Sequence, residues 1–254
     1  EPPPRPEPPP PRRESPPPPR EAGAREPGSP PGKAIPAGFG RAEAERGRRL
    51  FVEGCSSCHG FDARGIRGRA PSLRGAGAAS ADFYLRTGRM PLEDPRDQPL
   101  RTVPPYNREQ IRALVAYVGS FGGPQIPEVH PERGDLSVGL QLFTESCAGC
   151  HQGMAEGGIT TKGIAPDLQA SEPIDVAEAV RVGPYVMPHF PPKDIDQHEL
   201  DSITRYVVWT REPPDFGGWG VGHIGPIPEG MISWMLAGAS LLLVCRLIGE
   251  RTGE

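Results

Sequence analysis

The sequence is poor in hydrophobic and aromatic residues. Hydrophobic residues make up 36% of its 254 positions and aromatic residues 6%, whereas it holds 35 prolines and 33 glycines. This hydrophobic content is too low for one uniform core, so we expect ordered and disordered segments to be separated along the chain. Cysteine is also scarce. Only five are present, and four of them lie in two short clusters.

Several function classes lack their usual patterns here. No activated nucleophile, paired carboxylates or phosphate-binding loop stands out. The formal net charge of −4 argues against nucleic acid as a partner. We therefore expect no independent catalytic site.

The N-terminal segment is dominated by proline. Residues 1–36 hold 16 prolines, and Ile35 is their only large aliphatic residue. Such a segment buries too little apolar area to offset the entropy of ordering, and runs such as Pro16–Pro19 favour polyproline II. We predict that residues 1–38 form a disordered, semi-stiff tether. The alternative is a docking arm for a proline-binding partner.

The rest of the chain repeats one unit. GRRLFVEGCSSCH at Gly47–His59 aligns without gaps with GLQLFTESCAGCH at Gly139–His151. Three motif pairs then recur in the same order: APSL and APDL, LRTGRMP and VRVGPYVMP, REQIRALVAYVGSF and HELDSITRYVVWT. Several motifs repeated in one order indicate tandem copies. We predict one domain at 39–124 and a second at 125–212.

Both ends of each copy have helical patterns. Apolar residues in Arg108–Phe121 follow the i, i+3, i+4, i+7 rule, and His198–Thr210 carries a similar stripe. The middle of each copy is rich in glycine and proline, so we expect loops and short helices there. The predicted fold class is all-α.

Each copy contains one Cys-x-x-Cys-His cluster. The clusters are Cys55, Cys58 and His59 in the first copy, and Cys147, Cys150 and His151 in the second. This is the attachment sequence of c-type haem, in which two thiols add to vinyl groups and the next residue places an imidazole on the iron. A zinc site, disulfides and redox-active thiols are alternatives, but none requires a histidine after both pairs. We predict two covalently attached haem c groups, with Cys245 a packing residue.

Two of the five methionines lie in matching places. Met90 follows its histidine by 31 residues and Met187 by 36, and each directly precedes a proline. We predict His59/Met90 and His151/Met187 coordination, which raises the reduction potential. The alternative for a single methionine is core filling. His189 is a rival ligand for the second haem.

An apolar run lies near the C-terminus. After a Gly/Pro linker at 213–229, Met231–Cys245 contains no charge. With its flanks this run approaches the ~20 residues that span a bilayer, and the alternative is a buried core helix. We predict a transmembrane helix at 230–249. Arg246 and Arg251 follow the uncharged run and Glu229 precedes it, so we expect a cytoplasmic C-terminus and extracytoplasmic haem domains in the cell membrane. Because the first residue is Glu1, we also expect an export signal upstream.

Each copy resembles a small class I cytochrome c: helix, Cys-x-x-Cys-His, loop, Met-Pro, closing helix. The resemblance implies that the carbonyls of Pro71 and Pro166 orient the two histidines. It also implies that the outer helices of each copy cross near a glycine and an aromatic residue. Gly47, Phe51 and Tyr117 fit this crossing in the first copy, and Gly139, Phe143 and Tyr206 fit it in the second.

Residues 40–254 together resemble the dihaem cytochrome c subunit of the actinobacterial cytochrome bcc complex, a menaquinol:cytochrome c reductase. The resemblance rests on two tandem domains and one C-terminal span. It also rests on three sequence stretches: TGRMP in the first domain, GPYVMP in the second, and DFGGWGVGHIGPIPEGM before the span. It implies that electrons pass from a Rieske iron–sulfur subunit through both haems to a haem–copper cytochrome c oxidase, beside a cytochrome b subunit. Alternatives are a dihaem subunit of another oxidase or dehydrogenase, and a dihaem peroxidase-type enzyme.

The two copies carry opposite charge. Residues 37–120 hold 14 arginines and 9 acidic residues, whereas residues 127–212 hold 6 basic and 14 acidic residues. Opposite signs would attract the domains to each other or present an acidic face to the oxidase. The alternative is ordinary solvated surface.

Overall fold

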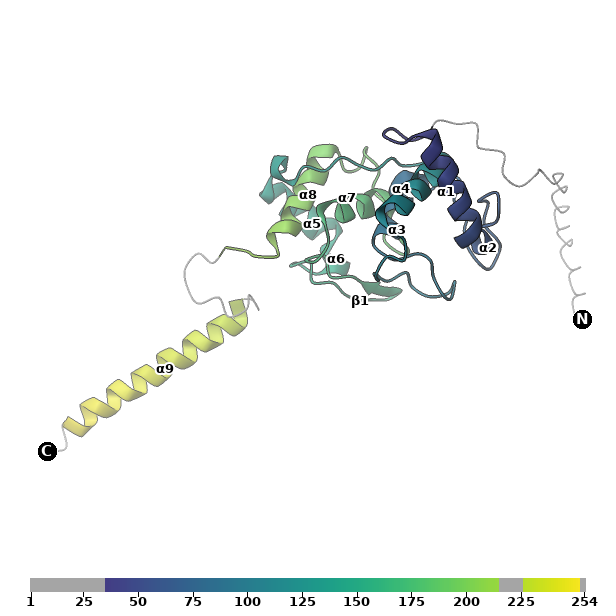
Figure 1. Cartoon of the computed structure of the whole chain (residues 1–254). Coiled ribbons are helices and arrows are strands. Elements are labelled where there is room, and N and C mark those ends of the chain that lie inside the picture. The colour runs from purple at the N-terminus through teal and green to yellow at the C-terminus, as the bar shows by residue number, and fades with distance from the viewer. Residues whose placement is uncertain (1–34, 215–225, 252–254) are drawn as a thin grey trace, which may run out of the picture. The chain divides into compact units, whose positions relative to one another are not determined.

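The computed structural model describes residues 35–214 and 226–251. Most of the predicted tether at 1–38 and of the predicted linker at 213–229 lies outside these residues. The described part is predominantly helical, as Figure 1 shows, which confirms the all-α fold class. Its helices are α1 (Arg41–Gly54), α2 (Ser56–His59), α3 (Gly77–Arg86), α4 (Arg108–Gly119), η1 (Pro131–Arg133), α5 (Leu136–Ser146), α6 (Ala148–His151), α7 (Pro173–Val182), α8 (Gln197–Trp209) and α9 (Pro226–Arg251).

The closing helix of each copy begins at a capping box. At the start of α4 the Asn107 side chain accepts from the Gln110 N–H, and the Gln110 side chain accepts from the Asn107 N–H, both at 3.0 Å. Asp196 and Glu199 make the same reciprocal pair at α8. Each box satisfies amides that the first helical turn leaves without partners. The chain therefore fixes the start of both closing helices locally.

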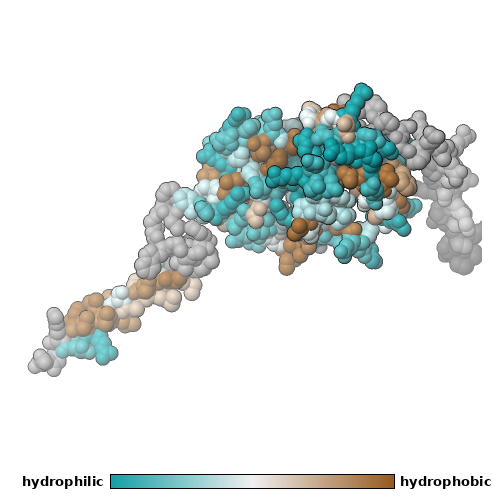
Figure 2. Space-filling model, in the orientation of Figure 1, coloured by the Kyte–Doolittle hydropathy of each residue, from teal (hydrophilic) through white to brown (hydrophobic). Residues whose placement is uncertain are grey.

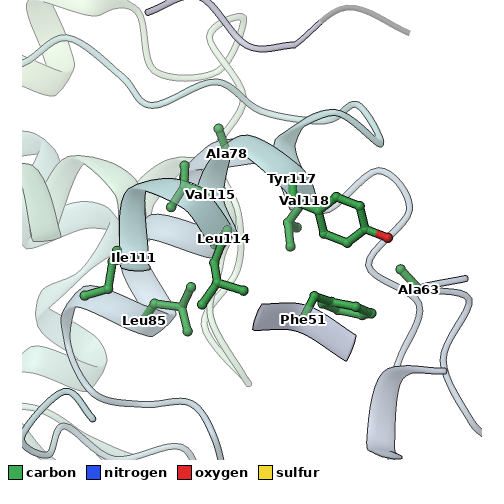
Figure 3. Close-up of a cluster of buried hydrophobic side chains, with 10 residues drawn as sticks. Phe51, Ala63, Ala78, Leu85, Ile111, Leu114, Val115, Tyr117 and Val118 are labelled. Carbon is green, nitrogen blue, oxygen red and sulfur yellow. The ribbon is translucent and has the colours of Figure 1, made fainter. Parts of the chain in front are cut away.

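The first core forms where α4 packs against α1 and α3. Figure 3 shows Phe51 of α1 and Leu85 of α3 with Leu114 and Tyr117 of α4. These side chains are almost fully buried. The rings of Phe51 and Tyr117 lie 5.3 Å apart between centroids. Burial of large side chains of this kind is the dominant stabilising contribution in a small domain.

The helix crossings require glycine. A Cβ at Gly47 would overlap the backbone carbonyl of Ala113, and one at Gly139 would overlap that of Ser202. These glycines let α1 approach α4, and α5 approach α8, at backbone distance. In the second copy Phe143 and Tyr206 repeat the aromatic pair of the first, with centroids 5.2 Å apart. The predicted crossings are thus confirmed in both copies.

One feature differs from the expectation of loops and short helices. Strands β1 (Gly158–Thr160) and β2 (Gly163–Ala165) form an antiparallel hairpin, with Ile159 opposite Ile164. In the first copy the equivalent loop makes a single bridge between Ile66 and Ala70. The second loop is three residues longer between its histidine and its proline. The extra length allows two short strands to pair.

The described chain divides into two compact units. Unit 1 comprises residues 35–127 together with 178–190, and unit 2 comprises 128–177 with the residues from 191 onward. The division falls inside α7, between Ala177 and Glu178. A segment from the second sequence copy therefore packs as part of unit 1. The predicted linear boundary between 124 and 125 does not anticipate this, and it stays a prediction.

Helix α9 has the length and composition of a membrane span. Its apolar window, Gly230–Glu250, contains 21 residues and none of it is buried. At 1.5 Å per residue this window is about 31 Å long, close to the ~30 Å hydrocarbon core of a bilayer. Figure 2 shows its surface as hydrophobic along most of its length. The buried-core alternative is disfavoured, because a core helix would be mostly buried and none of this window is.

Candidate haem sites

A pocket in unit 1 brings together predicted haem-binding residues of the first copy. Its lining includes Cys55, His59 and Met90. Most of the remaining wall is apolar, and includes Phe51 and Leu114. Haem c presents an apolar macrocycle and an iron that accepts nitrogen and sulfur ligands. A thiol, an imidazole and a thioether around one apolar pocket fit that group.

Local helix geometry sets up the attachment cluster. Helix α1 ends at Gly54, and the next turn, α2, carries Cys58 and His59. The His59 N–H donates to the Cys55 carbonyl at 2.9 Å, so these residues lie one turn apart. Residues four apart share a helix face, which explains why the thiol of Cys55 and the imidazole both reach the pocket. Helix α6 repeats this turn with Cys147, Cys150 and His151.

Both cluster histidines bond to a proline carbonyl. Nδ1 of His59 lies 2.9 Å from the Pro71 oxygen, and Nδ1 of His151 lies 3.1 Å from the Pro166 oxygen. Because a carbonyl only accepts, each Nδ1 donates a proton to its proline, which leaves Nε2 as the ring nitrogen that can bind a metal. The two imidazoles are thus oriented for a metal. The contacts implied for Pro71 and Pro166 are confirmed.

The two Cys-x-x-Cys clusters do not favour the redox and zinc alternatives. Burial, with a smaller effect from the neighbouring cysteine, raises the pKa of Cys55 and of Cys147 to about 11. Thiolates are the redox nucleophiles, so these two thiols, which stay protonated at neutral pH, are poor redox thiols. All five cysteines are free in the structure. No cluster of three or more His, Cys, Asp or Glu that could hold a metal ion occurs in the described ranges.

The predicted haem ligands of the second copy belong to different units. His151 is buried, and burial lowers its pKa, which favours the neutral imidazole. Met187 is partly buried and His189 is exposed. Both belong to the 178–190 segment of unit 1, whereas His151 lies in unit 2. Ligation by Met187, and the rivalry of His189, therefore stay predictions.

Sequence reasoning missed two residues of the first pocket. Val182 and Gly183, in the 178–190 segment of unit 1, line it together with Tyr84. The Tyr84 hydroxyl accepts from the backbone N–H of Tyr185 at 3.2 Å. No motif or periodicity predicts this, because the two stretches are about a hundred residues apart. They meet only through tertiary packing.

Comparison with known proteins agrees with two tandem cytochrome domains. Residues 44–121 match the family described as cytochrome c, and residues 134–207 match the family described as cytochrome c oxidase, cbb3-type, subunit III. The chain is also similar to the cytochrome bc1 complex cytochrome c subunit of Corynebacterium diphtheriae. The two are 32% identical over 231 residues, which cover 84% of this chain and 82% of the relative.

The chain belongs to the family of cytochrome bc1 complex cytochrome c subunits. The subunit of the same name from Mycobacterium leprae is 34% identical over 215 residues, covering 81% of this chain and 74% of the relative. As a member of this cytochrome c subunit family, the chain carries two covalently bound haem c groups and transfers electrons in a bc-type complex. Helix α9 fits single-pass anchoring of such a subunit.

Proposed function

We propose that the chain is the dihaem relay of a menaquinol:cytochrome c reductase. It takes electrons from a Rieske iron–sulfur subunit beside cytochrome b and passes them to a haem–copper oxidase. The observation that carries the proposal is the repeated site: two Cys-x-x-Cys-His turns in one chain, each with its histidine bonded to a proline carbonyl. Two centres on one polypeptide make a soluble carrier between the complexes unnecessary.

We also infer the axial ligands of each centre. His59 and Met90 would hold the first iron, and their placement on one pocket supports this pair. His151 and Met187 would hold the second, on the strength of the matching Met-Pro motif. Each haem, when bound, supplies a one-electron redox couple. The chain itself would attach the group, orient each imidazole through its proline carbonyl and surround the first centre with apolar side chains that exclude water.

The proposed orientation places both haem units on the extracytoplasmic side. Two arginines at the C-terminal end of the span support this, because positively charged residues stay on the cytoplasmic side. Protease treatment of intact spheroplasts tests it. The protease should digest the haem units and leave a C-terminal epitope intact. Loss of the epitope with intact haem units would exclude this orientation.

Affinity purification in mild detergent tests the partners. A tag on this chain should co-purify cytochrome b, a Rieske subunit and a haem–copper oxidase, with two haems c per copy of the chain. A matched preparation with Cys147 and Cys150 both changed to alanine should hold one haem c. Isolation with an unrelated dehydrogenase and without cytochrome b would contradict the proposal.

A second candidate rests on the oxidase-family match over residues 134–207. It assigns the chain to another oxidase as an anchored dihaem subunit. The same haem ligands would serve there, so only the partners in the purification separate the two functions. The peroxidase-type alternative needs an open iron position. Carbon monoxide binding to the reduced, intact protein would support it, whereas the proposed thioether ligands predict none.

A further inference from the structure

A buried acidic pair shares one arginine in unit 1. The Glu178 side chain is fully buried, and its Oε2 accepts from Arg86 Nη2 at 2.8 Å. Asp82 accepts from Arg86 Nε, also at 2.8 Å. The second oxygen of Glu178, Oε1, is buried without a hydrogen-bond partner. Two carboxylates against one guanidinium leave an uncompensated negative charge, which is costly in the interior.

One proton removes this charge. Burial first, and then the neighbouring Asp82, raises the pKa of Glu178 to about 9, against the lowering effect of Arg86. A protonated Glu178 carries an O–H that can donate to Asp82, which satisfies the oxygen that otherwise lacks a partner. The cluster then holds two carboxyl groups, one proton and one arginine, with no net charge.

The acidic pair borders the first haem pocket through two helices. On α3, Ala81 and Leu85 line the pocket, and they alternate with the two charged residues of the cluster. On α7, Val182 lines the pocket one turn after Glu178. The side chains next to the cluster that line the pocket, Ala81, Leu85 and Val182, are therefore apolar. Charges interact more strongly across such a medium than across water.

Other charged groups on the same helices have separate partners. Asp175 of α7 accepts from the Glu172 N–H, and Arg181 donates to the Phe190 carbonyl. Helix α3 carries no charged residue besides Asp82 and Arg86. Helix α4 packs against α3, and its Arg112 pairs with Glu43. Asp82 and Arg86 are the charged groups that shift the pKa of Glu178.

We propose that Asp82 and Glu178 form a proton-binding site whose occupancy is coupled to the oxidation state of the first haem. The proposal rests on the proposed electron-relay function. When one electron arrives from the upstream one-electron donor, the positive charge at the centre falls by one. The lower charge at the haem raises the proton affinity of the carboxyl pair. In the pH range where the oxidised form has released the shared proton, the pair then takes one proton from solvent and forms one O–H bond. On oxidation the electron leaves downstream and the proton returns to solvent.

Spectroelectrochemical titration of the full-length dihaem protein against pH tests this coupling. One of the two midpoint potentials should fall as pH rises through about 9, where the shared proton is released. The slope has an upper limit of about 59 mV per pH unit, the value for a tenfold change in proton concentration against one electron. Glu178→Gln mimics the protonated acid, so it should remove this slope and leave the other haem unchanged. Asp82→Asn should move the slope to lower pH.

A matched control and a second readout keep the outcomes distinct. Glu109→Gln changes an exposed carboxyl of the same unit and should keep the wild-type slope. Redox-difference infrared spectra should contain the C=O band of a protonated carboxyl, absent from Glu178→Gln. If Glu178→Gln does not fold, two measurements still test the proposal: the carboxyl C=O band of the wild type and the pH dependence of the potential in Asp82→Asn. The proposal would be overturned if neither wild-type midpoint potential depended on pH, or if the pH dependence remained in Glu178→Gln. Haem content and co-purified partners report on the proposed function separately.

Discussion

At the scale of single residues, the proline carbonyls fix which nitrogen of each haem-site imidazole can bind a metal. A histidine that donates from Nδ1 to Pro71 or Pro166 leaves Nε2 as that nitrogen. The ring is also held in one orientation before any metal arrives. The chain therefore orients one imidazole at each Cys-x-x-Cys-His cluster, and ligation by Met90 and Met187 stays a prediction.

Replacing Met90 with alanine should change the first haem and not its attachment. The thioether bonds form at Cys55 and Cys58, so haem content should stay at two per chain. Loss of the thioether ligand should lower one midpoint potential, within the ~0.8 V range that axial ligands set. Carbon monoxide should then bind the reduced protein, as visible spectroscopy would detect.

Met154 is the matched control for this substitution. It lies in the loop after the second cluster, too close to its own histidine to reach the opposite face of that haem. Met154→Ala should keep both potentials and exclude carbon monoxide. If Met90→Ala kept its potential and its low-spin spectrum, the assignment of the sixth ligand would be wrong.

Glu178 should also make stability depend on pH. Its pKa is raised from 4.5 to about 9, so the folded state binds a proton that the unfolded chain has released. The free energy of unfolding should therefore fall as pH rises from about 4.5 to about 9. Glu178→Gln should remove most of this fall. Urea denaturation of both proteins across this pH range measures it. Parallel pH profiles would show that Glu178 is already ionised in the folded state.

At the scale of helices, each unit depends on one close crossing. Gly47→Ala would push a methyl group into the Ala113 carbonyl and against Tyr117. Helix α1 would have to move from α4, at a cost of about 1–3 kcal/mol, the usual range for overpacking a tight contact. Chemical denaturation should show this loss, and Gly139→Ala should reproduce it in the second unit.

Gly149→Ala is the control for both glycine substitutions. A Cβ at this helical position meets nothing within 4 Å, and the first copy has Ser57 in the equivalent place. Because alanine favours helix over glycine, the variant should be neutral or slightly more stable. If Gly47→Ala were as stable as Gly149→Ala, the crossing would be looser than the structure indicates.

At the scale of the whole molecule, α9 is the element that fits a bilayer. Leu241→Arg would place a charge near the middle of its apolar window, where insertion scales assign about 3 kcal/mol to arginine. The variant should leave washed membranes more readily than the wild type. Leu100→Arg adds the same charge to an exposed loop and should stay membrane-bound. If Leu241→Arg and Leu100→Arg stayed in the washed membranes equally well, α9 would not be the membrane anchor.

Most of the haem chemistry was predictable from the sequence because it is local. Cys-x-x-Cys-His needs only one helical turn to place its thiols and imidazole, and that turn forms at both clusters. The tandem repeat and the apolar span are likewise patterns of neighbouring residues. The hairpin at 158–165 was missed because its short, glycine-flanked strands carry no alternation long enough to read.

The sequence by itself determined two haem-attachment turns, their order along the chain and one membrane span, because each is fixed by residues within a few positions of one another. Only the tertiary structure decided that the 178–190 segment joins unit 1 and that Val182 lines the first pocket. It alone brought Glu178 to Arg86. That pair is separated by 92 residues, and its meeting depends on which helix faces pack together, a property that no local pattern encodes.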